Sequence, residues 1–311
     1  MALRQDCGVT FRDPNAARMP KAPFKPLFKA AASMNPAFRF DDVDVLVDRT
    51  SLCRLLDFSA GRRQDSFRWN LHLVRRTLVI ERCEKDARAY IPAAPDNPTW
   101  GKGFEDSFTW YAKPLQDSAS HHRALRYQFG DLSCVVRCEV DACYKESQGQ
   151  LAANPFPTKD SSVIKRLQQK APMGQAWVAE VKTASKNGAS IGQYMPQVWF
   201  GRTPWLIVGR HQKGNFTSVD ITNMEAEFPA WEARHQHSLR MMASVLAQLR
   251  RVIEENGGEH CVAVCEEEVL PPAIGVFPSA LARNVVSDDL RRQLWRTEEA
   301  EVTTGETSQF R

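Results

Sequence analysis

Two short stretches with alternating side chains constrain the fold of this chain more than any other feature of its sequence. They are CVVRCEVDACY at Cys134–Tyr144 and AWVAEVKTASK at Ala176–Lys186. In each stretch, apolar and β-branched residues alternate with polar ones, which is typical of a half-buried β-strand. We therefore predict that both stretches are strands, and that they are neighbours.

The polar faces of these two strands would bring several charges together. Side chains alternate between the two faces of a strand. Glu139 and Asp141 therefore share one face of the first strand, and Glu180 and Lys182 share one face of the second. Three carboxylates in one small volume would repel one another and raise one another's pKa.

A bound divalent cation is the simplest way to keep the three carboxylates ionised together. Hard oxygen ligands favour Mg²⁺ or Mn²⁺ over zinc. A lysine beside such an ion suits a substrate phosphate. A pair of strands joined only by salt bridges is the structural alternative.

The remaining composition is that of an ordinary globular protein. The 311 residues are enough for one large domain or two smaller ones, and 43% of them are hydrophobic and 25% charged. No apolar run approaches the length of a membrane span, and the N-terminus lacks the apolar core of a secretory signal. We expect a nuclear or cytoplasmic protein that is not secreted and has no membrane partner.

The cysteines offer a metal site of a second kind, which we reject. Two pairs have C-x-x-x-C spacing, Cys134 with Cys138 and Cys261 with Cys265, and this spacing falls within the range of zinc sites. Both pairs lie in strand-like runs, where residues four apart are separated by about 13 Å. One ion cannot hold both members, so we predict buried thiols that act as small apolar residues.

The chain divides into three predicted regions. Residues 1–27 are basic and contain several prolines, and we expect a flexible arm. Residues 28–265 form a single catalytic domain, and residues 266–311 form a C-terminal tail that is partly disordered. The expected elements are a short strand or turn entering a helix near Ser51, a hairpin or bent strand of Phe67–Leu73 with Thr77–Glu81, a helix that starts at Gly101 and carries Glu105, a basic helix at Ser161–Lys170, a hairpin of Pro204–His211 with Asn215–Thr222, a long helix at Ala230–Glu255 and a short one after Ser287.

This order of elements resembles the decapping exoribonuclease family, the eukaryotic DXO-like enzymes that remove aberrant or NAD caps from RNA 5′ ends. The resemblance covers about residues 40–255 and rests on five short motifs in their family order: Arg49 in DRTSLCRLL, Gly101 through Glu105 in GKGFE, Glu139-Val140-Asp141, Glu180-Val181-Lys182 before Thr183, and Gln197 followed by Pro204 and Gly209. No single motif is specific, whereas their order and spacing together are. GKGFE stands where the family usually has G-Y-K-F-E, and Thr50 where it has glycine, which affects the expected substrate preference more than metal binding.

The resemblance implies a mixed α/β (α+β) fold with two β-sheets flanked by helices, distantly similar to the PD-(D/E)XK nucleases. It also implies roles for individual residues. By this resemblance, the ligands of one or two divalent ions are Glu105, Glu139, Asp141, Glu180 and the carbonyl of Val181. The residues that orient the scissile phosphate are Lys182 and Gln197, and the residue that contacts the RNA or cap is Arg49.

From the residues and the resemblance together we expect a metal-dependent RNA 5′-end hydrolase. Its substrates would be capped, NAD-capped or triphosphorylated ends, with or without accompanying 5′–3′ exoribonuclease activity, and a 5′–3′ exoribonuclease is a candidate partner. Two alternatives stay open. One is a DNA nuclease of the PD-(D/E)XK type, and the other is a catalytically inactive protein that binds RNA ends or supports an exoribonuclease. Arg49, Gln197 and the E-x-D motif favour RNA, and the complete set of acids argues against an inactive protein.

Overall fold

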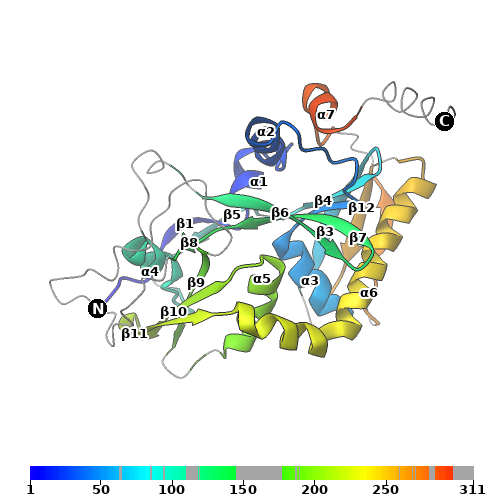
Figure 1. The fold of residues 1–311 in the computed structure, drawn as a ribbon. Helices are drawn as coiled ribbons and strands as arrows, with labels where there is room; N and C mark the ends of the chain where they lie inside the picture. Colours follow the sequence, from blue (N-terminus) through cyan, green and yellow to red (C-terminus); the bar gives the residue numbers. More distant parts are fainter. Residues whose placement is uncertain are drawn as a thin grey trace, which may run out of the picture. The chain divides into compact units, whose positions relative to one another are not determined.

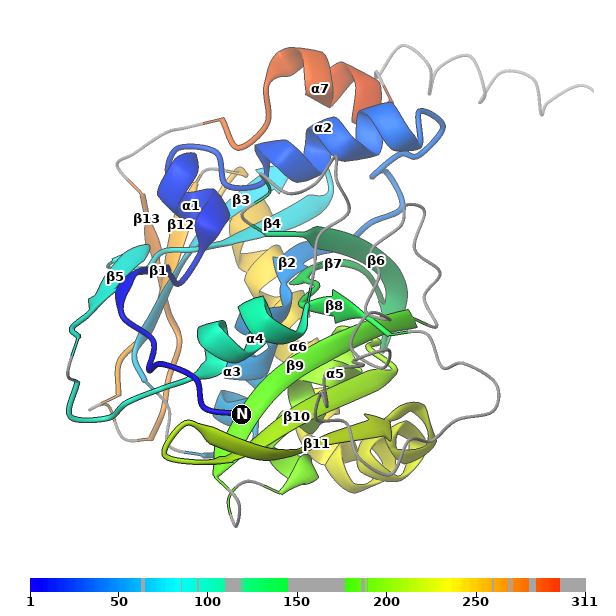
Figure 2. The same cartoon turned by 90° about the vertical axis from the view of Figure 1, so that its left-hand side faces the viewer.

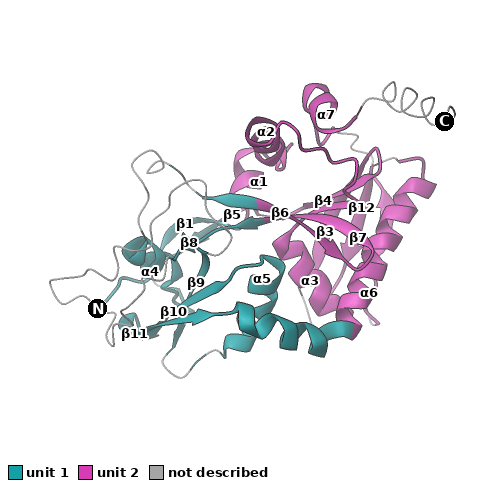
Figure 3. Ribbon diagram, in the orientation of Figure 1, with its two compact units in different colours: residues 1–12, 88–123, 138–236 teal, residues 13–87, 124–137, 237–311 magenta. Residues whose placement is uncertain are grey.

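The computed structural model describes residues 1–62, 65–84, 86–93, 95–109, 118, 120–144, 177–185, 188, 190–258, 260–267, 269, 271–279 and 284–296 (Figure 1). The chain forms two compact units, and it passes between them several times. Unit 1 comprises residues 1–12, 88–123 and 138–236, and unit 2 comprises residues 13–87, 124–137 and 237–311 (Figure 3). Each unit is described by itself below.

Unit 2 is built on a seven-stranded mixed sheet with the order β13-β12-β3-β4-β2-β7-β6. The central strand β2 pairs in parallel with both β4 and β7, while β3 and β4 form an antiparallel hairpin. The strands are β2 (Val45–Asp48), β3 (Phe67–Val74), β4 (Thr77–Arg82), β6 (His122–Phe129), β7 (Leu132–Glu139), β12 (Cys261–Cys265) and β13 (Gly275–Pro278).

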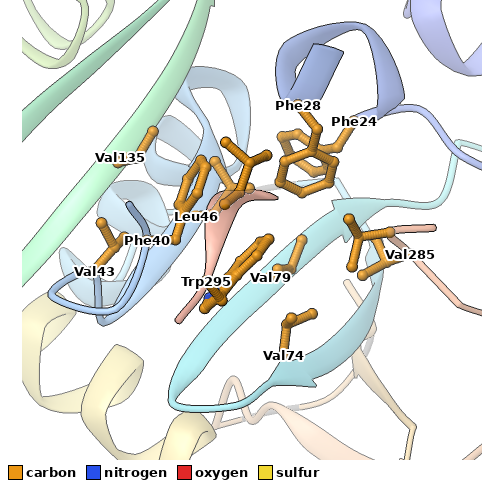
Figure 4. Packing of buried hydrophobic residues seen from close by; sticks show 12 residues of the cluster. Phe24, Phe28, Phe40, Val43, Leu46, Val74, Val79, Val135, Val285 and Trp295 are labelled. Carbon is orange, nitrogen blue, oxygen red and sulfur yellow. The ribbon is translucent and has the colours of Figure 1, made fainter. Parts of the chain in front are cut away.

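The helices of unit 2 are α1 (Pro14–Arg18), α2 (Lys25–Met34), α3 (Arg49–Ser59), α7 (Asp288–Leu294) and most of the long helix α6 (Phe228–Glu255). Among these helices, α2 and α7 come from opposite ends of the chain and pack into one core. Phe28 of α2 and Phe40 pack against Trp295, which directly follows α7, and the rings of Phe40 and Trp295 stack at 4.8 Å (Figure 4). The Trp295 indole donates to the Thr77 hydroxyl at 3.1 Å, so this buried polar group is paired.

Unit 1 contains a four-stranded sheet with the order β11-β10-β9-β8. β9 (Val178–Ser185) lies between β10 (Trp205–Gln212), with which it is parallel, and β8 (Ala142–Cys143), with which it is antiparallel; β11 (Asn215–Asn223) closes a hairpin with β10. Helix α4 (Gly101–Phe108) packs against β9 (Figure 2). A short 3-10 turn at Ile191–Tyr194 leads into α5 (Met195–Phe200). A separate ribbon pairs β1 (Gly8–Phe11) with β5 (Arg88–Ile91).

The predicted fold class is confirmed, since the structure is mixed α+β with two main sheets and flanking helices. Both hairpins, the helix from Gly101, the long helix and the short helix after Ser287 are present. The four cysteines of the C-x-x-x-C pairs are buried free thiols. The expected helix at Ser161–Lys170 lies outside the described residues. No helix in the described part of the chain is long and apolar enough to cross a membrane.

Three expectations differ from the structure. The stretch Cys134–Tyr144 is not one strand, because β7 ends at Glu139 and the next strand, β8, begins at Ala142 in the other sheet. Residues 1–27, expected to be a flexible arm, contain β1 and α1. They also contain Phe24, which is fully buried in the unit 2 core.

Part of the expected C-terminal tail is also packed, because β13 and α7 lie within it and Trp295 is a core residue. The apolar side chains at both ends of the chain bury each other, which a local composition pattern does not reveal. The disorder expected at the very end falls outside the described residues, and the extent of a single catalytic domain at 28–265 stays a prediction.

Candidate active site

The change of sheet after Glu139 determines where Asp141 lies. The Val140 N–H donates to the His121 carbonyl at 2.9 Å, and β8 then pairs with β9 through Ala142 opposite Ala179. Asp141 precedes β8 directly, and its Oδ2 accepts a hydrogen bond from the backbone N–H of Val181 at 2.9 Å. The short strand β8, rather than β7, is therefore what carries Asp141 to β9, while Glu139 ends β7.

Glu180 and Lys182 share one face of β9, as the alternation of side chains requires. The Lys182 Nζ lies 2.6 Å from Glu180 Oε1 and 3.8 Å from Asp141 Oδ2. Glu180 is almost completely buried, at 1% exposed. A buried carboxylate is costly unless a charge partner accompanies it, so the ammonium of Lys182 is the group that allows both acids to lie here.

Helix α4 brings a third acid, Glu105, to β9. Phe104 and Phe108 of α4 pack with Val181 and Ile207 in the core of unit 1. Gly209 of β10 provides the space for Phe104, because a Cβ atom at position 209 would lie 2.5 Å from the Phe104 ring. This close packing fixes α4 on the sheet, and Glu105 follows Phe104 in the helix.

The start of α4 is capped by Asp6, which sequence reasoning missed. Trp100, at the N-cap position, makes no capping bond with its own side chain. The Asp6 carboxylate instead accepts from the N–H groups of Lys102 at 3.2 Å and Gly103 at 2.9 Å, and from the Thr99 hydroxyl at 3.0 Å. A carboxylate satisfies the free N–H groups of a helix start. Asp6 and Gly103 are 97 positions apart, so no local pattern indicates this contact.

Like charges at this site raise one another's pKa. We call Glu105, Glu139, Asp141 and Glu180 the carboxylate cluster; the ammonium of Lys182 lies beside Glu180 and Asp141, and the charges of Lys102 and Lys182 both act on Glu105. Burial raises the pKa of Glu105 to about 7, and the charges of Glu139 and Asp106 add to this effect.

The same holds for Asp141, for which burial and the charge of Glu180 raise the pKa to about 7. The ammonium of Lys182 and the N–H of Val181 act in the opposite direction without balancing them. Both acids therefore hold protons at neutral pH more readily than ordinary carboxylic acids do. An additional cation at the cluster would relieve this repulsion.

The donors of the cluster fit a hard divalent cation in chemistry and in charge, since carboxylate oxygens are the ligands that Mg²⁺, Mn²⁺ and Ca²⁺ prefer. The spacing of these donors supports a metal site less than their chemistry does. No group of three or more histidine, cysteine or acidic side chains among the described residues is arranged as a ready-made metal centre. The Lys182 ammonium lies between Glu180 and Asp141 in this arrangement.

The other predicted site residues have less support from the geometry. Gln197 lies in α5 of unit 1, and its buried Oε1 has no hydrogen-bond partner among the residues that the structure describes. Buried polar atoms are normally paired, so this amide oxygen is suited to a polar ligand. Arg49 begins α3 in unit 2. The roles of Gln197, Arg49 and the Val181 carbonyl stay predictions.

Comparison with known sequences gives a family without an assigned role. The sequence model of a family described as "Domain of unknown function (DUF8563)" matches residues 1–295. No curated protein matches the chain.

Comparison with solved structures is more informative about the fold. Scheffersomyces stipitis Rai1 in complex with (3′-NADP)⁺ and calcium ion is 12% identical, with 87% of this chain and 79% of that chain covered and a TM-score of 0.56. S. pombe Rai1 is 11% identical, with 85% and 83% covered and a TM-score of 0.54. Candida albicans Rai1 in complex with pU5-Mn²⁺ is 12% identical, with 92% and 81% covered and a TM-score of 0.51.

At this low identity the similarity shows a shared fold. It spans most of both chains, so this chain shares the fold of Rai1, a DXO-like protein. The resemblance that the five motifs indicated is thereby confirmed at the level of the fold.

Proposed function

The chain belongs to the family described as a domain of unknown function (DUF8563), and from its site we propose that it is a metal-dependent hydrolase of RNA 5′ ends. Its substrates would be capped, NAD-capped or triphosphorylated RNA, and 5′–3′ exoribonuclease activity would accompany end hydrolysis. The observation that supports the proposal is the set of acids at β9 in a chain with the fold of Rai1: Lys182 lies 2.6 Å from Glu180 and 3.8 Å from Asp141, and burial and like charges raise the pKa of Glu105 and Asp141 to about 7.

The chain's own groups would divide the work as follows. Glu105, Glu139, Asp141 and Glu180 would hold one or two divalent ions, with the Val181 carbonyl as a further ligand. Such ions supply an activated water and stabilise the leaving oxygen of an in-line displacement. Held between Glu180 and Asp141, Lys182 is placed to turn toward a bound phosphate and stabilise its developing charge.

The relatives' ligands support this choice of substrate and ion. Rai1 of Candida albicans was solved with pU5-Mn²⁺, and Rai1 of Scheffersomyces stipitis with (3′-NADP)⁺ and calcium ion. A uridine oligonucleotide and a dinucleotide with a divalent ion are the kinds of ligand that a 5′-end hydrolase would bind. Arg49 and Gln197 would contact the RNA or cap and the phosphate in this proposal.

A second function remains a candidate, because Lys182 lies 2.6 Å from Glu180 and no ready-made metal centre occurs among the described residues. A protein that binds RNA ends without cleaving them, and supports a 5′–3′ exoribonuclease partner in the nucleus or cytoplasm, would need no metal. The two functions differ in whether hydrolysis occurs once metal is supplied.

Product analysis tests the proposal. RNAs of one sequence with a triphosphate, a guanosine cap or a NAD cap are incubated with the purified chain and Mn²⁺ or Mg²⁺, and the products are resolved. We expect release of the 5′-end group with metal and none in EDTA, and we expect duplex DNA to be a poor substrate. Full activity in EDTA would contradict metal dependence. RNA binding without hydrolysis would support the second function, and preferential cutting of duplex DNA would support a DNA nuclease.

A further inference from the structure

The ribbon of β1 and β5 has an unusual distribution of side chains. Val9 lies opposite Tyr90 and Phe11 lies opposite Arg88 in the antiparallel register. Residues two apart in a strand share a face, so these four side chains form one face of the ribbon. We call them the ribbon face. Arg88 lies over the Phe11 ring, with 5.7 Å from Cζ to the ring centroid.

The ribbon face is apolar and points to solvent, which is the reverse of the usual arrangement. Tyr90 is 73% exposed, Val9 58% and Phe11 39%. The opposite face, formed by Gly8, Thr10, Ala89 and Ile91, is half-buried and mostly small. A two-stranded ribbon is only marginally stable and normally buries its larger apolar side chains. Exposed apolar residues that gather in one place indicate a binding surface.

The ribbon is attached to the helix that carries Glu105. Asp6 caps α4 two positions before β1 begins, and its N–H donates to the Thr99 carbonyl at 2.8 Å. From Asp6 to Val9 the chain spans three residues, and from Gly103 to Glu105 two. The ribbon face therefore begins no more than about 25 Å from Glu105. Both features belong to unit 1.

Charge and size favour one kind of ligand. The charged side chains of segments 1–12 and 88–93 are three arginines and one aspartate: Arg4, Arg12, Arg88 and Asp6. Asp6 is used as a cap, and the three arginines are exposed, with the exposed Asp86 two positions before Arg88, so the charge around the ribbon is positive on balance. A stable protein interface needs roughly 800 Å² on each partner, which four side chains do not provide. Stacking of one or two nucleobases needs only one or two exposed rings, with arginine nearby for the phosphates.

We propose that the ribbon face is a stacking platform for unpaired bases of a single-stranded RNA. The Tyr90 and Phe11 rings would each stack with a base, and Arg88 would add a cation–π contact and pair with phosphate. The choice of RNA over DNA rests on the proposed function of the carboxylate cluster. Binding to the ribbon itself needs neither metal nor hydrolysis.

Equilibrium binding in EDTA tests the platform without cleavage. The probe is a fluorescein-labelled decauridine, and the readout is fluorescence anisotropy with the full chain. Removing a ring that stacks with a base should weaken binding about fivefold or more, and Tyr90→Ala with Phe11→Ala together should weaken it more than either alone. Tyr90→Phe keeps the ring and should bind as the unchanged chain does. The matched control is Ile221→Ala. Ile221 is an apolar residue on β11 of the same unit, and at 39% it is as exposed as Phe11.

The outcomes separate this proposal from the proposed function. Weaker binding by Tyr90→Ala, with recovery in Tyr90→Phe, supports the platform even if no RNA is hydrolysed when metal is added. Unchanged affinity in the Tyr90→Ala, Phe11→Ala double variant overturns the platform even if hydrolysis is robust. Analytical sedimentation of the same preparations tests whether the ribbon face instead binds a second copy of the chain. If the unchanged chain is a dimer that the ring variants dissociate without losing RNA affinity, the ribbon face binds a second copy and the proposal is wrong.

Discussion

One group of buried or half-buried charges in unit 2 and another in unit 1 use similar residues to reach different electrostatic states. In unit 2, Arg137 is 4% exposed and donates to both Asp48 oxygens, at 2.5 and 2.9 Å. Arg82 donates to Asp13 at 3.0 Å. We call Asp13, Asp48, Arg82 and Arg137 the paired cluster. Each of its acids lies against a guanidinium group, and Arg82 also lies 3.5 Å from Glu84, whereas in the carboxylate cluster Lys182 lies beside two of the four acids.

The pKa values follow this difference. Burial alone would raise the pKa of Asp13, but the Ala16 N–H and the guanidinium groups of Arg137 and Arg82 outweigh burial and lower it. In the carboxylate cluster, burial and like charges raise the pKa of Glu105 and Asp141 to about 7. Buried acids that are already paired contribute to the fold, while acids left with excess charge are suited to a ligand. The predictions below test this contrast, from the largest expected effect to the smallest.

Removing Arg137, the central cation of the paired cluster, should lower the unfolding free energy more than any other change. Arg137→Met keeps much of the side-chain volume but leaves Asp48 buried without its main partner. Breaking a buried pair in this way costs about 3–5 kcal/mol of unfolding free energy, measured by urea denaturation. Arg292→Met is the control, because its partner Asp289 is exposed and the pair lies at the surface. Equal stability of Arg137→Met and the unchanged chain would mean that the paired cluster does not hold the fold.

The carboxylate cluster should respond in activity rather than in stability. Asp141→Asn and Glu180→Gln should each lower the rate of RNA 5′-end hydrolysis on the order of 10²–10³-fold. The double variant should cost little more, since the two act as one unit. The melting temperature without metal should stay the same or rise, because each change relieves repulsion. Near-normal rates in both single variants, with folded protein, would show that the site lies elsewhere.

Metal should stabilise the chain through the carboxylate cluster alone. At a Mn²⁺ concentration about 100 times its Kd, the stabilisation is about 2.7 kcal/mol, which raises Tm by about 4 °C in a chain of this length. Differential scanning fluorimetry with Mn²⁺ and then excess EDTA measures the shift and its reversal. Asp141→Asn should lose the shift, and Asp13→Asn should keep it. An equal shift in both variants would place the ion outside the carboxylate cluster.

The paired cluster should lose its advantage in acid. Asp13→Asn keeps the helix cap but removes the charge opposite Arg82, and a hydrogen bond to a charged group contributes about 1.5–3 kcal/mol. The pKa of Asp13 is lowered from its ordinary value of 3.8, so its stabilisation is complete above that value and is lost as pH falls below it. Urea denaturation of Asp13→Asn and of the unchanged chain between pH 7 and pH 3 should show that the difference in their unfolding free energies shrinks as the pH falls. A difference that grows in acid would mean that the pKa is raised.

The smallest expected effect concerns the cap of α4. Asp6→Ala removes the acceptor for Lys102 and Gly103 and should cost about 1 kcal/mol, while Asp6→Asn retains capping oxygen and should cost less. Because Asp6 acts through the helix that carries Glu105, Asp6→Ala should also lower Mn²⁺ affinity in calorimetry, with a smaller change for Asp6→Asn. Reduced stability with unchanged Mn²⁺ affinity would show that Glu105 does not depend on this cap.

Local patterns predicted the parts of this site that lie within one element. The alternation of AWVAEVKTASK placed Glu180 and Lys182 on one face of β9, where Nζ and Oε1 lie 2.6 Å apart. The apolar period of the long helix and Gly257 after it predicted α6 and its end, and Gly257 has the positive φ of 73° that favours glycine. Each of these patterns lies within a single strand or helix, so it can be recognised from one sequence without knowledge of the tertiary contacts.

Contacts between distant segments were out of reach of such patterns. Val140 is as β-branched and apolar as any residue inside a strand, so alternation does not reveal the change of sheet beside it. Asp6 and Asp13 lie in a stretch whose composition indicated a flexible arm, and each gains its role from residues far along the chain, Gly103 and Arg137. The balance of charge in the paired cluster depends on three-dimensional neighbours in the same way.

The lack of space beside Gly209 has a consequence for how this family can diversify. A side chain at this position would meet the Phe104 ring at 2.5 Å and the Phe216 ring at 2.8 Å. Any lineage that replaces the glycine must therefore also reshape Phe104 and release α4 from the sheet. The residue aligned with position 209 thus provides a simple marker: members that keep glycine can retain Glu105 beside β9, and members that have lost it are the first in which to look for a lost or altered activity.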